Sequence, residues 1–305
     1  MEGKAIVNEM PLNTKRDKSK ETTDLKYKEK ISTRARISAW VSRIIIIIMC
    51  LIVLFPVFAV VTASMSKGQV FIQKSLLPAS WSFENYIKVI QDTNYLIWLK
   101  NSLIVCTAVS VIQLLLTIPA AFAFSKLKFK LRNKGLLALI VLQMFPATMA
   151  LPAILAVAYR INGMDNFLVL ILIQCAGSAY NIWLMKGYID GIPDELVEAA
   201  YVDGATTFQT FVKIIFPLMK SMIAVIFLFS FIGAYSEFFF TSALMKQPGN
   251  FTLATGMRTF IKDKFSSNWT QYSAAAVMSS VPLVILFLLS QRFISKGLVA
   301  GAVKG

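Results

Sequence analysis

The residue types that carry most enzyme chemistry are scarce in this sequence. It contains no histidine, and its three cysteines, Cys50, Cys106 and Cys175, all lie within apolar runs. These facts exclude the usual zinc sites and histidine acid–base arrangements, and they make a disulfide framework unexpected. The sequence also lacks the glycine-rich lysine motif that cradles nucleotide phosphates and the G-x-S-x-G turn of a nucleophilic serine. We therefore expect no catalytic residue, no metal site and no cofactor bound by this chain.

Acidic residues gather instead in the polar stretch from 187 to 217. Pro193 suits the first turn of a helix, and negative charge just after it would lie at the positive end of the helix dipole. The spacing that follows predicts one small apolar face, with acidic side chains projecting elsewhere. The predicted face comprises Leu196, Ala199 and Ala200, and the projecting acids are Glu195, Glu198 and Asp203.

A second helix is expected after a turn at Asp203 and Gly204, because glycine readily adopts positive φ. Thr206 followed by Gln209 fits a capping box. An apolar stripe is expected along this helix, and Pro217 is expected to end it; the stripe comprises Phe208, Phe211, Val212 and Ile215. We call residues 187–217 the knob, a compact protrusion suited to docking in a cleft of a partner protein.

The rest of the chain is strongly apolar. With 56% hydrophobic residues and a mean hydropathy of +0.64, it is typical of a multi-pass membrane protein. Six stretches are long enough to cross about 30 Å of hydrocarbon at about 1.5 Å per residue. The predicted fold is therefore an all-α bundle of six transmembrane helices, at about 44–64, 102–124, 135–158, 166–185, 218–240 and 273–290.

The distribution of positive charge predicts the orientation of this bundle. An even number of spans puts both termini on one side, and that side carries 21 lysines and arginines against 9 on the other. The positive-inside rule then makes both termini and the knob cytoplasmic. Residues 1–43 form a basic polar tail without interleaved aromatic residues, so we expect it to fix orientation rather than bind nucleic acid.

Two loops on the other side differ in character. Residues 65–101 include an amphipathic pattern, Phe83, Tyr86, Ile87 and Ile90, which predicts a helix lying along the outer interface. Residues 241–272 mix aromatic and polar residues, and from the residues alone an ordinary polar connector is as good an interpretation as a docking loop.

Polar side chains inside the predicted spans are costly and usually face a bundle interior or a water-filled cavity. Glu237 is the strongest functional candidate, with snorkelling to the interface or pairing with a neighbouring helix as the alternative. Pro146, beside Gln143 and Met144, marks either a gate or a static bend. The polar candidates in the spans are Gln113, Gln143, Gln174, Asn181 and Glu237.

The knob also carries a family resemblance. Glu198-Ala199-Ala200, three residues, Gly204, nine residues, Ile214 and Pro217 resemble the EAA signature of the membrane subunits of ATP-binding-cassette (ABC) importers. Phe216 departs from the usual leucine before the proline. QMFPA at 143–147, AAAVMS at 274–279, QRF at 291–293 and GLVAGAVKG at 297–305 are similar to inner-membrane permeases of the maltose and maltodextrin type.

The resemblance implies a type I importer transmembrane domain over 44–296, in the cytoplasmic membrane of a bacterium. It implies a second, unlike permease, two copies of an ATPase subunit that binds ATP and magnesium, and an external sugar-binding protein that the 241–272 loop reaches towards. The knob would enter a cleft of the ATPase, Glu198 making polar contacts, Ala199 and Ala200 allowing close approach and Gly204 setting the angle between helices. Further coupling residues would be Asp203, Phe208, Ile214 and Pro217, with Val303, Lys304 and Gly305 of the 297–305 tail touching the ATPase dimer.

The transported substance would be a sugar or oligosaccharide, selected mainly by the external receptor. Residues expected along its route are Gln143, Met144, Tyr180, Asn181, Tyr235 and Glu237. Two alternatives remain. The chain transports a different solute, as a related permease or a secondary carrier, although the internal repeats and paired broken helices of secondary carriers are not evident in the sequence. Alternatively, it is a membrane-embedded enzyme or scaffold that works without an ATPase.

The position of the knob outside the bilayer generates a first prediction. Glu198→Lys, or Gly204→Pro, should leave insertion and folding intact but uncouple transport from ATP hydrolysis, because the knob lies outside the bilayer. Uptake and ATP hydrolysis by the reconstituted complex in vesicles check this. Normal transport by both variants would show that the knob is wrongly assigned.

Overall fold

The computed structural model describes residues 33–68, 77–78, 80–261 and 268–302. Within these ranges every regular element is helical, apart from one isolated β-bridge between Ser66 and Trp81. The predicted all-α class is confirmed for this part of the chain. The chain divides into two compact units, residues 1–54 and 55–305, and the fold below is that of the second unit.

The helices alternate between long spans and short connecting segments. η1, η3 and η4 are 3₁₀ turns, and η2 is a π-helix. In chain order they are α1 (Thr33–Ser64), α2 (Glu84–Asp92), α3 (Tyr95–Lys126), α4 (Arg132–Gln143), η1 (Ala147–Ala150), α5 (Leu151–Arg160), α6 (Phe167–Cys175), α7 (Ala179–Asp190), α8 (Asp194–Val202), α9 (Thr207–Thr210), η2 (Phe211–Ile215), α10 (Phe216–Leu218), α11 (Lys220–Ser236), α12 (Phe239–Leu244), η3 (Pro248–Asn250), α13 (Leu253–Gly256), η4 (Met257–Ile261) and α14 (Trp269–Ala302).

Three of the predicted spans are single helices and three are broken. Residues 36–64 of α1, the whole of α3 and residues 269–293 of α14 are each long and apolar enough to cross a membrane. The other three candidates are pairs of helices bent by 74° near Pro146, 48° near Gly177 and 76° at Met219. By length and composition the described residues therefore hold three candidate spans, or up to six when each bent pair counts as one.

Hydropathy located these segments but not the bends. The predicted span 135–158 is divided between α4 and α5, and 166–185 is divided between α6 and α7, which continues to Asp190. The predicted span 218–240 is mainly α11, which ends at Ser236 before the chain turns again into α12. A run of apolar residues shows only whether a segment is long enough to cross the hydrocarbon layer. A bend depends instead on proline, on glycine and on which neighbouring side chains pair with the freed backbone groups.

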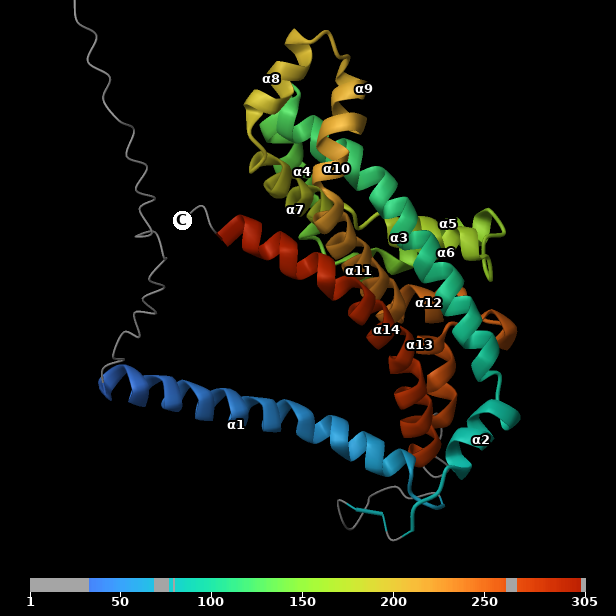
Figure 1. Ribbon diagram of the computed structural model, residues 1–305. Coiled ribbons are helices and arrows are strands. Elements are labelled where there is room, and N and C mark those ends of the chain that lie inside the picture. The colour runs from blue at the N-terminus through green and yellow to red at the C-terminus, as the bar shows by residue number, and fades with distance from the viewer. Residues whose placement is uncertain (1–32, 69–76, 79, 262–267, 303–305) are drawn as a thin grey trace, which may run out of the picture. The chain divides into compact units, whose positions relative to one another are not determined.

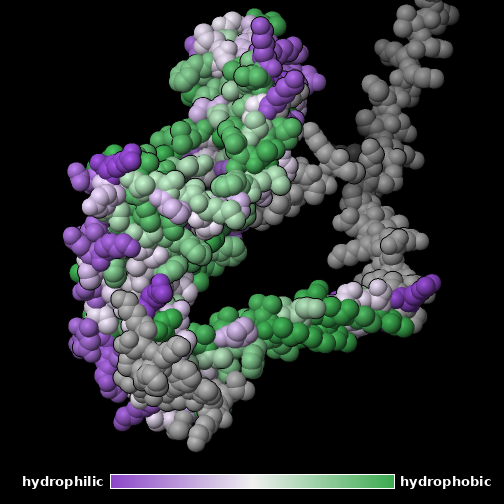
Figure 2. All heavy atoms as spheres, turned by 180° about the vertical axis from the view of Figure 1, so that it is seen from behind, coloured by the Kyte–Doolittle hydropathy of each residue, from purple (hydrophilic) through white to green (hydrophobic). Residues whose placement is uncertain are grey.

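α3 lies at the centre of the second unit. It packs most extensively against α11 and α7, and its buried side chains contribute to all three apolar clusters of the core. Figure 1 shows α3 running from α2 at one end of this unit to α8 and α9 at the other. Figure 2 shows hydrophilic residues at the α8 and α9 end and along one edge of the lower part, with hydrophobic residues between them.

Residues 241–261 of the predicted 241–272 loop form a folded element that packs on α3. Trp98 Nε1 donates to Pro248 O at 3.1 Å, and Asn101 Nδ2 donates to Gly249 O and Phe251 O at 2.9 and 3.0 Å. Gly256 lies directly against the Trp98 ring. These pairings join residues about 150 positions apart, so no local pattern could indicate them.

An amphipathic helix is present at the expected place, as α2, and its position along the outer interface stays a prediction. Phe83, Ile87 and Ile90 are exposed along one side, and the opposite side buries Asn85 and Val89. Lipid or a partner is the natural environment for such an exposed apolar stripe.

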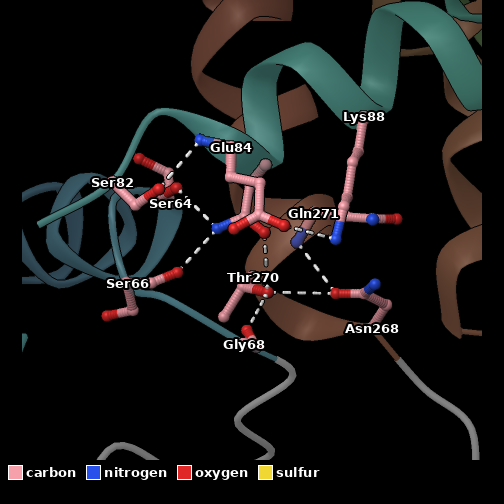
Figure 3. A network of polar contacts seen from close by, with 10 residues as sticks. Ser64, Ser66, Gly68, Ser82, Glu84, Lys88, Asn268, Thr270 and Gln271 are labelled. Carbon is pink, nitrogen blue, oxygen red and sulfur yellow. Dashed lines mark hydrogen bonds and ion pairs between the residues drawn. The ribbon is translucent and has the colours of Figure 1, made fainter. Parts of the chain in front are cut away.

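α2 is fixed by a polar network with the end of α1 and the start of α14, shown in Figure 3. Asn85 Nδ2 donates to Ser64 O and Ser66 O at 3.0 and 2.8 Å. Thr270 Oγ1 lies 3.3 Å from Asn85 Oδ1 and 2.9 Å from Gly68 O. The buried amide thus gains partners from segments that are far apart in the chain, which satisfies its hydrogen-bonding groups.

The contact between Gly256 and Trp98 generates a second prediction. A Cβ atom at position 256 would lie within 2.7 Å of three ring atoms of Trp98, which is 3% exposed and has little room to move. Gly256→Ala should therefore lower the stability of the protein in detergent by about 1–3 kcal/mol. Thermal unfolding checks this, with Gly249→Ala as the matched control because nothing lies within 4 Å of its added Cβ. Equal unfolding temperatures for the two variants would contradict the close packing.

Candidate functional site

The first helix of the knob is α8, which is held to the body by one narrow face. Val197 and Ala200 are its buried residues, and Ile192 just before it is buried in the same apolar cluster. Of the predicted small apolar face, Ala200 is buried, whereas Leu196 is 42% exposed and Ala199 is also exposed. One side of this short helix carries Leu196, Ala199 and Ala200, and an overlapping side carries Val197 and Ala200. The second side faces the body, where Val197 packs in the same apolar cluster as Ile192.

The turn after α8 matches the prediction. Gly204 has φ of +79°, and Ala205 N donates to Ala200 O at 2.9 Å, which closes the end of the helix. Nothing lies within 4 Å of a Cβ built on Gly204, so backbone conformation alone favours glycine here. Glu198 and Asp203 are both exposed near this turn.

The capping box predicted for the second helix is also confirmed. Gln209 N donates to Thr206 Oγ1 at 3.2 Å, and Thr206 N donates to Gln209 Oε1 at 2.9 Å. The prediction that the helix ends at Pro217 is wrong: the helix continues to Leu218 and bends at Met219. The π-helix before the proline, with Phe216 N donating to Phe211 O, accommodates the missing proline N–H.

The tip of the knob presents apolar and acidic side chains together. Val202 is 88% exposed and Phe208 is 73% exposed, close to the exposed Glu198 and Asp203. Within the predicted apolar stripe, Ile215 is buried and Phe211 half-buried, whereas Phe208 and Val212 are exposed. Of the remaining predicted coupling residues, Ala200 is buried, Ile214 half-buried and Pro217 exposed. The surface of the knob is therefore partly apolar.

A second feature is a cavity of about 990 Å³ with walls from α3, α4, α6, α7 and α11. Its lining is mostly apolar with a few polar groups, as in ligand sites generally. Four predicted route residues line it: Gln143, Tyr180, Asn181 and Glu237.

Two predicted route residues do not line the cavity. Met144 is 77% exposed at the bend after α4, and the buried Tyr235 donates its hydroxyl to Ser279 O at 2.8 Å on α14. An aromatic side chain near the end of a span gives no indication of the direction in which it points. Three polar lining residues were not among the predicted route residues, although two had been noted as polar groups in spans: Gln113, Gln174 and Ser230.

The polar lining residues are connected to one another. Asn181 Nδ2 donates to Gln113 Oε1 and lies within hydrogen-bond distance of Ser230 Oγ, both at 3.1 Å. Gln113 Nε2 donates to Gln174 O at 3.0 Å. Gln143 Oε1 accepts from Tyr180 N at 3.0 Å and so caps the start of α7. The cavity wall therefore has a band of amides joining α3, α6, α7 and α11.

Glu237 pairs with the helix that follows it. Its carboxylate accepts from Phe240 N at 2.8 Å, from Thr241 N at 3.0 Å and from Thr241 Oγ1 at 2.7 Å. A carboxylate at a helix N-terminus is stabilised by the free N–H groups there. Glu237 thus closes the turn from α11 into α12 while it lines the cavity.

The predicted contacts of Val303, Lys304 and Gly305 fall outside the described residues, as does most of the basic tail at 1–43.

Comparison with known proteins gives consistent matches. Residues 110–299 match the family described as binding-protein-dependent transport system inner membrane component. The maltodextrin transport system permease protein MdxG of Bacillus subtilis is 30% identical over 259 residues, which is 85% of this chain and 93% of that protein.

Two further matches are to proteins of transport systems for other sugars. The galactooligosaccharides transport system permease protein GanQ of Bacillus subtilis is 31% identical over 268 residues, 87% of this chain and 95% of that protein. In a solved bacterial ABC transporter involved in the import of alginate, one chain is 25% identical with a TM-score of 0.73. The match covers 86% of this chain and 98% of that chain.

The amide band generates a third prediction. Asn181→Leu should destabilise the protein by about 1–3 kcal/mol, because it leaves the buried Gln113 Oε1 without its donor. Adding Gln113→Leu should cost less than the sum of the single changes, since the two side chains are partners. Unfolding of the single and double variants in detergent measures this coupling, and strict additivity would show that the hydrogen bond contributes nothing.

Proposed function

Because this chain belongs to the family of binding-protein-dependent transport system inner membrane components, we propose that it is the permease subunit of an ABC importer for a neutral oligosaccharide of the maltodextrin type. The observation that carries this proposal is the family match together with the exposed knob. An external sugar-binding protein would deliver the substrate, and the cavity lined by the amide band would form this subunit's part of the route.

The charge of the cavity supports a neutral substrate. Among the described residues that line it, Glu237 alone is charged, and no lysine or arginine is present. An acidic sugar entering a cavity of low dielectric would meet a carboxylate and no compensating cation, which is unfavourable. Amide groups, in contrast, suit hydroxyl groups as donors and acceptors. An acidic polysaccharide such as alginate is therefore the less favoured alternative, and galactooligosaccharides remain a neutral one.

The knob would receive force from a separate ATPase subunit. Glu198 and Asp203 would make polar contacts in the ATPase cleft, and Ala199, Val202 and Phe208 would fill its apolar part, because all five are exposed. Ala200 would instead seat α8 on the body, a different role from the close approach expected from the resemblance. Gly204 would set the angle between the two helices of the knob.

Movement of the knob would reach the membrane through the second helix. α9, η2 and α10 form one helical stretch that bends by 76° into α11, and α11 contributes Ser230 and Gly233 to the cavity wall. Closure of the ATPase on ATP would tilt this stretch and turn α11, so that the cavity opens alternately outward and inward. The energy comes from the different contacts that the ATPase makes with the two states.

We further propose six spans with both termini cytoplasmic, a second and unlike permease that completes the pathway, and two ATPase copies. Ile214 and Pro217 would keep the second helix of the knob in register with α11. The 241–261 segment, packed on α3 at the end opposite the knob, would lie on the side that faces the binding protein.

A fourth prediction tests this function directly. The tagged protein should co-purify in detergent with a second permease and an ATP-hydrolysing subunit. Vesicles containing this complex should accumulate labelled maltodextrins only when ATP and the cognate binding protein are both present. Acidic oligosaccharides of equal length serve as the control and should not accumulate. Uptake without ATP would contradict the proposal, and selective uptake of the acidic sugar would contradict the substrate class.

A further inference from the structure

The last turn of α3 is tied to the start of the knob by polar contacts that the proposed coupling surface does not include. Lys126 is the final residue of α3, and its side chain is only 4% exposed. Its Nζ donates to Ile192 O at 2.7 Å and to Asp194 Oδ1 at 2.5 Å. Both acceptors lie where the chain passes from α7 into α8.

A neighbouring contact strengthens this connection. Ser125 Oγ donates to Asp190 Oδ1 at 2.6 Å, and Asp190 also binds Lys186 Nζ at 2.6 Å. Asp190 is the last residue of α7 and Asp194 the first of α8. The turn between these helices is therefore held on both sides by the end of α3. We call the contacts of Ser125 and Lys126 with Asp190, Ile192 and Asp194 the α3 latch.

The end of α3 is itself well anchored. Arg132 Nε donates to Phe124 O at 2.8 Å, and Arg132 Nη2 donates to Ser125 O. A guanidinium at a helix C-terminus pairs with carbonyls that have no partner within the helix, and it interacts favourably with the helix dipole. The latch therefore joins the knob to a firm point.

The latch contributes more to the orientation of α8 than to the stability of the fold. The Asp194 side chain is 75% exposed, and ion pairs with such exposure contribute little to folding. Lys126, which donates a hydrogen bond to Asp194 and attracts it electrostatically, lowers the pKa of this carboxyl below its ordinary value. Besides this contact, α8 packs against α9 and buries two of its own residues, Val197 and Ala200. The latch adds a direct connection between α8 and α3.

α3 connects the latch to the cavity. Val109 and Gln113 line the cavity from the same unbroken helix that ends at Lys126. Thirteen residues of helix separate Gln113 from Lys126, which corresponds to about 20 Å. A displacement at one end of a packed helix is carried along it, and Gln113 is hydrogen-bonded both to Gln174 O and to Asn181.

From this geometry we propose that Lys126 is a positioning residue that joins α8 to α3 and so carries movement of the knob to the cavity wall by a second route, beside the one through α11. The inference rests on the proposed function, since it concerns how force from the ATPase reaches the transport route. It assigns the α3 latch a part in coupling that differs from the ATPase contacts proposed for Glu198, Val202 and Phe208.

The test compares variants in vesicles that contain the complete complex and its binding protein. Lys126→Met keeps the buried stem and removes the ammonium group, and Lys126→Arg keeps the charge. Lys130→Met is the matched control, because Lys130 is exposed in the same connection. The quantity measured is the number of sugar molecules taken up per ATP hydrolysed, together with the amount of assembled complex. Lys126→Met should assemble and hydrolyse ATP but lose about threefold or more in this ratio. Lys126→Arg should restore part of the loss, and Lys130→Met should equal the wild type.

A second variant keeps the proposal testable if Lys126→Met does not assemble. Asp194→Ala removes the exposed partner, is expected to fold, and should lower the ratio by a smaller factor. In an assembled double variant the loss should be no greater than that of Lys126→Met alone, because both changes break one contact. A wild-type ratio in assembled Lys126→Met, or in Asp194→Ala when Lys126→Met fails to assemble, overturns the proposal. Failure of the wild-type complex to take up sugar would instead overturn the proposed function.

Discussion

The structure depends on one constraint, that backbone polar groups in an apolar environment must find partners within the protein. Long helices meet this constraint by themselves, as α3 and α14 do. Three of the candidate spans are bent, and at each bend side chains or turns replace the lost helix bonds. Gln143 Oε1 accepts from Tyr180 N at the start of α7, Ser178 Oγ donates to Cys175 O, and Tyr188 OH donates to Leu218 O beside the bend at Met219.

The cavity lies at two of these bends. Gln143, Gly177 and Tyr180 belong to them and also line the cavity, and Glu237, in the turn from α11 into α12, lines it as well. A polar group that is needed to satisfy a broken helix is thus also available to a solute. Polar side chains are costly in an apolar bundle, and their hydrogen bonds at the bends and turns offset that cost here.

The knob differs from the spans, because it is polar and several of its apolar residues, including Val202 and Phe208, are exposed. Its shape is fixed locally by the capping box at Thr206 and the positive φ of Gly204. Its attachment is fixed by contacts with distant parts of the chain, through Val197 in an apolar cluster with α3 and α7 residues and through the α3 latch. A protrusion that is rigid in itself and firmly seated can pass a partner's movement into the membrane.

The sequence alone determined the helical class, the approximate positions of the apolar segments, the turn at Gly204 and the capping box. These features depend on composition or on residues within about four positions of each other, so a linear pattern contains them. The family resemblance also came from linear patterns: the spacing within 198–217 and four short segments elsewhere in the chain. Only the tertiary structure decided which face of α8 is buried, that Met144 and Tyr235 point away from the cavity, that Gln113 and Ser230 line it, and that residues 241–261 pack on α3. Each of these outcomes depends on the rotation of a helix about its axis or on a contact between segments up to about 150 residues apart, and neither is encoded in local periodicity.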